Sequence, residues 1–130
     1  MNIGNQQRLY EEICRVLKPG GRFALQEMVA GDTAATYVPL PWATHPADNS
    51  LVAAAETSAA LSLCGFEQMY FADVSEEPLP PPAGGTAEAV AQAPLSLSVY
   101  VDDLALKADN AARSLRERQI RLFRGVFRVK

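Results

Sequence analysis

The chain has 130 residues, of which 48% are hydrophobic, so it forms at most one domain with room for a buried core. Its formal charge of −3 excludes the strongly basic surface that nucleic-acid-binding proteins present. No apolar run is long enough for a membrane span, and no charged-then-apolar leader opens the chain. We therefore expect a cytoplasmic protein that binds neither nucleic acids nor membranes.

The stretch from Leu9 to Gly31 predicts an amphipathic helix, a tight turn and a strand. Apolar residues recur there at helical spacing, at Leu9, Ile13, Val16 and Leu17. Pro19 cannot continue a helix, and Gly20 and Gly21 supply the positive φ that a helix terminus needs. The mostly apolar residues 22–29 then predict a strand that is covered on both faces.

Further helices and strands follow. Ser50 to Cys64 is alanine-rich and predicts a helix, with Ser50 as its N-cap and Gly65 as its C-terminal stop. Phe66 to Val74 predicts a second strand, and Ile120 to Val129 alternates as a third. The chain is therefore expected to fold as an α/β domain.

Between the second and third strands the sequence changes character. Residues 76–94 contain the string PLPPPAGG, which is typical of a Pro/Gly-rich linker within a domain. A helical stripe then follows, with small and apolar residues at Leu104, Ala108, Ala111, Ala112 and Leu115. The linker could be a variable insertion on the substrate side or a flexible arm.

The seven residues RVLKPGG, Arg15 to Gly21, resemble the helix–PGG–strand segment in the second half of class I methyltransferases that depend on S-adenosylmethionine (SAM). Further similar strings follow in the family's order: MNI at Met1 to Ile3, PLPWA at Pro39 to Ala43, and CGFE at Cys64 to Glu67. The final NAARSLRERQIRL, Asn110 to Leu122, resembles the last helix and strand of the same group. The strings are most similar to small-molecule methyltransferases of the ubiquinone-biosynthesis and glycine/sarcosine types.

This resemblance implies only the back half of the family's fold, a partial Rossmann-like sheet of about three strands with flanking helices. The C-terminal strand would lie between the other two strands and run antiparallel to both. Residues 1–130 would form a single domain, the acceptor-side portion of a methyltransferase. The strand at 22–29 would lack the neighbour that it has in a complete enzyme, and its open edge predicts a homodimer or a hetero-partner.

The resemblance also implies where a small-molecule methyl acceptor binds. Met1 and Asn2 fall where the family has residues near the reacting methyl group, although Asn2 or Asn5 can also serve as an ordinary N-cap for the first helix. Glu27 lies late in its strand, where a carboxylate could orient or deprotonate the acceptor or could simply be an exposed charge at the strand end.

The long loop after the strand at 22–29 covers the substrate in the resembled enzymes. Tyr37 and Trp42 lie in this loop, and we expect both to line the acceptor pocket. Trp42 could offer its π face to a cationic group, or it could anchor the loop to the core. His45 is the only histidine and has no carboxylate partners at suitable spacing, so no metal site is expected.

The sequence lacks the glycine-rich GxGxG turn that binds SAM in the resembled fold, and no acidic residue closes a second strand to hold the ribose hydroxyls. The leading hypothesis is the acceptor-side portion of a SAM-dependent methyltransferase, which transfers a methyl group to a small molecule. Alone it would bind SAM weakly or not at all. The alternative is a non-catalytic, truncated paralogue that pairs with a complete enzyme or with a missing half.

Overall fold

The computed structural model describes residues 1–33, 36–77 and 99–130. The predicted linker at 76–94 lies outside these residues except at its first two positions. In chain order the elements are α1 (Gln6–Val16), β1 (Arg22–Ala30), the 3₁₀ turn η1 (Pro46–Asp48), α2 (Ala54–Leu63), β2 (Phe66–Asp73), α4 (Leu104–Arg116) and β3 (Ile120–Val129). No helix in this part of the chain is long and apolar enough to cross a membrane.

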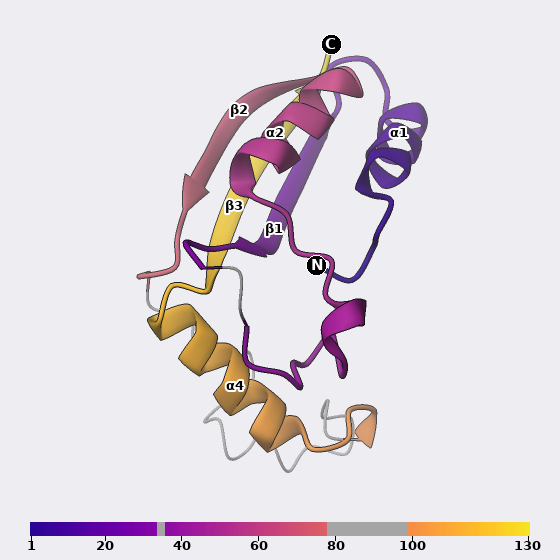
Figure 1. Cartoon of the computed structure of the whole chain (residues 1–130). Coiled ribbons are helices and arrows are strands. Elements are labelled where there is room, and N and C mark those ends of the chain that lie inside the picture. Colours follow the sequence, from indigo (N-terminus) through magenta and orange to yellow (C-terminus); the bar gives the residue numbers. More distant parts are fainter. Residues whose placement is uncertain (34–35, 78–98) are drawn as a thin grey trace.

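The strands form one sheet in the order β1-β3-β2 (Figure 1). β3 runs antiparallel to both neighbours, and its pairing with β1 extends without interruption from Arg22 opposite Arg128 to Ala30 opposite Ile120. The pairing with β2 shifts register between Gln68 and Tyr70. The predicted α/β fold, with the C-terminal strand in the centre and antiparallel, is confirmed.

The core lies between one face of the sheet and the two helices α1 and α2. Its fully buried members are Tyr10, Leu61, Phe66 and Phe127, which come from both helices and from β2 and β3. The ring of Phe71 lies 5.6 Å from that of Phe127, and Gly125 is needed beneath these rings, because a Cβ there would lie 2.8 Å from Phe71. α4 lies beyond the end of the sheet, next to the start of β3 (Figure 1).

The prediction that the first strand is covered on both faces is wrong for its first half. Phe23 and Leu25 pack against the core, whereas Arg22, Ala24 and Gln26 on the opposite face are exposed. The helices α1 and α2 cover only one face of the sheet, so alternate residues of β1 remain in water. At the preceding turn Gly20 alone has a positive φ, of 76°.

The predicted start of the second helix is also wrong. The helix begins at Ala54, and Ser50 does not cap it. The backbone N–H of Ser50 donates instead to the carbonyl of Met1 at 2.8 Å, and the carbonyl of Val52 accepts from the N–H of Ala30 at 2.8 Å. The residues before α2 thus bond to Met1 and to the last residue of β1 instead of forming the first turn of the helix. The predicted C-terminal stop is confirmed, since Gly65 has a φ of 93°.

Candidate functional site

The carboxyl ends of β1 and β2 meet the start of β3 at one end of the sheet, beside α4 and the loop that follows β1 (Figure 1). In open α/β sheets, ligands bind outside the carboxyl ends of the strands. The polar side chains at this end of the sheet are therefore the first candidates for a functional site.

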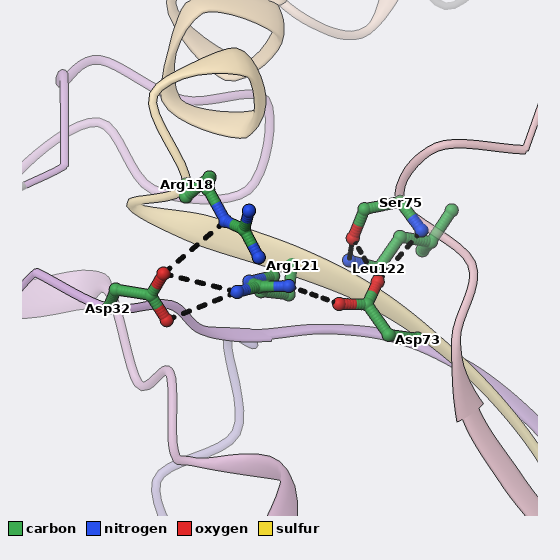
Figure 2. A network of polar contacts seen from close by, with 6 residues as sticks. All are labelled: Asp32, Asp73, Ser75, Arg118, Arg121 and Leu122. Carbon is green, nitrogen blue, oxygen red and sulfur yellow. Dashed lines mark hydrogen bonds and ion pairs between the residues drawn. The ribbon is translucent and has the colours of Figure 1, made fainter.

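Arg121 joins the ends of β1 and β2 (Figure 2). Its Nη2 atom lies 3.1 Å from Oδ2 of Asp32, which follows β1, and its Nη1 atom pairs with Oδ2 of Asp73, the last residue of β2. Arg118 adds a longer contact to Asp32, at 3.4 Å from its Nε atom. Both carboxylates that close these strands are therefore neutralised by arginines of the same chain.

Ser75 completes this network (Figure 2). Its backbone N–H donates to Oδ1 of Asp73 at 2.9 Å, and its hydroxyl accepts from the N–H of Leu122 at 2.9 Å. Burial opposes ionisation of Asp73, but the hydrogen bonds from Ser75 and Arg121 outweigh it and hold the pKa of the carboxyl below its usual value. The network fixes the geometry of the sheet end and leaves Asp73 in its charged form.

The residue after β1 docks directly onto the turn between α4 and β3. The N–H of Gly31 donates to the carbonyl of Gln119 at 2.9 Å, and the N–H of Asp32 donates to the carbonyl of Arg118 at 2.9 Å. A Cβ at Gly31 would lie 2.0 Å from the carbonyl oxygen of Arg118, so only glycine fits there. Arg118 itself has a φ of 58°, which is uncommon for a residue with a side chain. This contact places Gln119 at the carboxyl end of β1.

Met1 and Glu27, two of the residues expected at the acceptor site, contact each other. The backbone nitrogen of Met1 lies 2.6 Å from Oε1 of Glu27, and the hydroxyl of Tyr10 donates to Oε2 at 3.4 Å. The side chain of Glu27 is only 15% exposed, so it is not a solvated charge at a strand end. Burial and the neighbouring Glu27 carboxylate raise the pKa of Tyr10. Asn2 is exposed, and Asn5 is the residue that caps α1.

Tyr37 anchors the loop after β1 to α4. Its backbone N–H donates to the hydroxyl of the buried Ser114 at 3.2 Å, and its own hydroxyl donates to Oε2 of Glu117 at 2.7 Å. The guanidinium carbon of Arg113 lies 3.9 Å from the centre of the tyrosine ring. Hydrogen bonds from Tyr37 and Arg113 lower the pKa of Glu117. The tyrosine thus fixes the wall of the site by its contacts to one helix.

Trp42 holds together the same loop, which follows β1. Its indole N–H donates to Oδ1 of Asn49 at 3.0 Å, and the amide of Asn49 donates to the hydroxyl of Thr36 at 3.1 Å. Leu40 and Ala43, on either side of the tryptophan, are buried. These contacts match the reading in which Trp42 anchors the loop.

A cavity of about 270 Å³ lies at the carboxyl end of β1. Residues of β1, of the loop and of the α4–β3 turn line it: Ala30, Thr33, Thr36, Asn49, Leu51 and Gln119. None of the five residues expected at the acceptor site is in this lining, although Trp42 holds Asn49 and Tyr37 holds Glu117, the partner of Gln119. Sequence reasoning missed Asn49 and Gln119, because neither stands in a motif or at a marked spacing.

The described residues do not fit a SAM site by themselves. The sequence has no glycine-rich turn between a strand end and a helix. Two acidic residues do close strands, Asp32 after β1 and Asp73 at the end of β2, but both carboxylates are paired with Arg121.

Comparison with known proteins identifies the fold. No protein-family model matches the chain, and no curated protein matches its sequence. Among solved structures, the [4+2]-cyclase SpnF is 22% identical, with 96% of this chain and 44% of that chain covered at a TM-score of 0.57. Residues 942–1257 of the StiE O-MT are 18% identical, with 98% and 40% covered at a TM-score of 0.56. The chain has a class I methyltransferase-like fold and spans less than half the length of either structure.

Proposed function

We propose that this chain is the acceptor-side part of a SAM-dependent methyltransferase that acts on a small molecule, with the cofactor held by residues outside the chain. The observation that carries the proposal is the similarity to methyltransferase-fold structures over 96% and 98% of this chain but only 44% and 40% of theirs. The sequence also lacks the GxGxG turn that binds SAM in the resembled family. The string RVLKPGG and the others in the family's order support the same assignment.

The geometry at the carboxyl end of β1 suits the acceptor-side role. Methyl transfer needs little covalent help from a protein, because holding the acceptor in line with the methyl group supplies most of the rate. The loop anchored by Tyr37 and Trp42 provides a fixed wall for such an acceptor. Glu27 provides a largely buried carboxylate, which the hydroxyl of Tyr10 and the terminal nitrogen of Met1 contact.

The test begins with the DNA upstream of the Met1 codon. If this chain is the acceptor-side part of one enzyme, the upstream reading frame encodes an in-frame strand–GxGxG–helix segment. The product of the longer frame should bind SAM and transfer a labelled methyl group to small-molecule acceptors, whereas residues 1–130 should do neither. Micromolar SAM binding by residues 1–130 alone would contradict the proposal, and so would a longer product with no SAM affinity.

A second candidate function rests on the outer edge of β1. The N–H of Gly31 points towards Gln119, the residue before β3. The N–H of Ala30 points away from β3 and donates to the carbonyl of Val52. Since successive residues of a strand alternate, the backbone groups of Arg22, Ala24, Gln26 and Met28 also point away from β3. They have no hydrogen-bond partner among the described residues. The other outer strand, β2, is interrupted by its register shift and is a poorer template.

This free edge supports a non-catalytic role, in which the chain is a truncated paralogue that pairs with itself or with a complete methyltransferase. The chain alone should then form a stable dimer at micromolar concentration by analytical ultracentrifugation. Ala24→Pro removes an outward N–H without touching the bonds to β3, so it should give a monomer. Ala24→Val keeps the N–H and should remain dimeric. A wild-type monomer at these concentrations would refute self-pairing.

A further inference from the structure

We propose that a cavity between the end of β2 and the α4–β3 turn binds a small organic anion, whose carboxylate or phosphate group pairs with Arg116 and Arg118. The cavity has a volume of about 350 Å³, which suits a small molecule. It is lined by Ser75, Glu76, Leu115, Arg116, Arg118 and Arg121. The inference goes beyond the proposed function, because it holds whether or not the bound molecule accepts a methyl group.

The charge of the lining favours an anion. Three of the six lining residues are arginines, and Glu76 is the only acidic residue among them. The two carboxylates of the neighbouring network, those of Asp32 and Asp73, do not line the cavity, and both pair with Arg121. A ligand in the cavity therefore meets more positive than negative charge, and guanidinium groups bind carboxylates and phosphates well.

Two of the lining arginines have donors that no other residue in the described part of the chain uses. The Nε atom of Arg118 lies 3.4 Å from Asp32, but the guanidinium donates no hydrogen bond within residues 1–33, 36–77 and 99–130. The side chain of Arg116 makes neither an ion pair nor a hydrogen bond within the same ranges. By contrast, Arg15 and Arg113 are also exposed, and each binds a glutamate within 2.9 Å. The donors that line the cavity are therefore free for a ligand.

The free nitrogens of Arg118 face the cavity. Figure 2 shows its two terminal nitrogens on the side away from Asp32, which is the side of Ser75. Ser75 lines the cavity and Asp32 does not, so these nitrogens point to the cavity. The side chain of Arg118 is 57% exposed, so a ligand that arrives from water can reach it.

The backbone of Arg118 is held in a conformation that favours another residue type. Its φ of 58° is uncommon for a residue with a side chain, and glycine adopts it at lower energetic cost. The N–H of Arg118 donates to the carbonyl of Leu115 at 3.1 Å, and its carbonyl accepts from the N–H of Asp32 at 2.9 Å. Such conformations cluster at functional sites, and the fixed backbone lowers the ordering cost of binding.

The cavity at the carboxyl end of β1 gives the contrast within the same molecule. Its lining contains no charged residue. A carboxylate or phosphate bound there would lose its hydration without compensation. Anions should therefore leave the signals of Thr33 and Asn49, which line that cavity, unchanged.

The test is an NMR titration of isotope-labelled residues 1–130 at low ionic strength with benzoate, phenyl phosphate, phenol and benzylamine. Benzoate or phenyl phosphate should shift the signals of Ser75, Glu76, Arg116 and Arg118, and the tighter binder shows which oxyanion the cavity prefers. Phenol has no charge and benzylamine has the opposite charge. Both should bind at least about tenfold more weakly, which is the effect of one charge-assisted hydrogen bond.

Variants test the roles of the lining residues. Arg118→Gln and Arg116→Gln should each weaken the binding of the preferred anion at least about tenfold. Arg22→Gln is the matched control, because Arg22 is an exposed arginine at the opposite end of β1 and should not affect binding. Glu76→Gln removes the only negative charge of the lining and should tighten the binding at least about twofold, since a like charge nearby repels the anion.

Equal shifts by benzoate and benzylamine would overturn the inference, and so would no binding of either anion at millimolar concentration. Equal weakening by Arg22→Gln and Arg118→Gln would also overturn it, because the attraction would then come from surface charge in general. The titration uses no SAM. Anion binding by residues 1–130 together with a longer product that transfers no methyl group would therefore refute the proposed function alone.

Discussion

Replacing Gly31 by alanine tests whether the end of β1 docks onto the α4–β3 turn. The added Cβ would lie 2.0 Å from the carbonyl oxygen of Arg118 and 2.7 Å from the carbonyl carbon of Gln119, both backbone atoms that cannot rotate away. The two hydrogen bonds made by Gly31 and Asp32 would be lost or stretched, at about 0.5–1.5 kcal/mol each. A buried carbonyl left without its donor adds to this cost, so the unfolding free energy should fall by about 2–4 kcal/mol.

Chemical denaturation followed by circular dichroism measures this change. Gly4→Ala is the matched control, because its Cβ would meet nothing closer than the Ser50 hydroxyl at 3.8 Å and should change stability by less than about 0.5 kcal/mol. Gly31→Ala should also lower the midpoint of thermal unfolding by roughly 10 °C. If both variants unfold at the same denaturant concentration as the wild type, the docking of β1 on this turn is wrong.

Three further predictions concern the sheet and its titratable groups. Gly125→Ala should cost about 1–3 kcal/mol in denaturation experiments, because its Cβ would lie 2.7 Å from the ring of Phe127; an unchanged midpoint would contradict the packing. The lowered pKa of Asp73 gives stability that is present above its unfolded pKa of about 3.9 and is lost as the pH falls through its folded value, so Asp73→Asn should flatten the acid limb of a melting series. The raised pKa of Tyr10 gives stability that is present below its unfolded value of 10.0 and is lost as the pH rises from there. Tyr10→Phe should therefore flatten the fall of the melting temperature at alkaline pH. A fall as steep as that of the wild type would refute the buried contact with Glu27.

Local sequence patterns predict the helix–turn–strand unit at Leu9 to Gly31 and the strands of the sheet correctly. The period of Leu9 and Ile13 marks the buried side of α1, and the alternation in β3 marks its core face. Local patterns fail to predict the start of α2, where contacts with residues distant in the sequence decide the backbone conformation. Ser50 is a good capping residue, but the segment from Ser50 to Val52 bonds to Met1 and to Ala30 of β1, and α2 starts four residues after Ser50, at Ala54.

The polar sites were the least predictable from sequence. Arg121 pairs with Asp32 across 89 positions, and Tyr37 pairs with Glu117 across 80, and no local period encodes such distances. Glu27 and Tyr37 were singled out because of their place in a resembled family, and their partners became visible only in the fold. Gln119 carries no signal in the sequence, since its backbone bonds to Ser114 and Gly31 arise only in the fold.

The central claim is that this chain provides the acceptor side of a methyltransferase fold without the cofactor side. Calorimetric titration of SAM into residues 1–130 tests it most directly. Because the sequence has no glycine-rich turn and Arg121 occupies the carboxylates of Asp32 and Asp73, the titration should give no saturable binding heat up to millimolar SAM. Saturable binding with a micromolar dissociation constant would contradict the account.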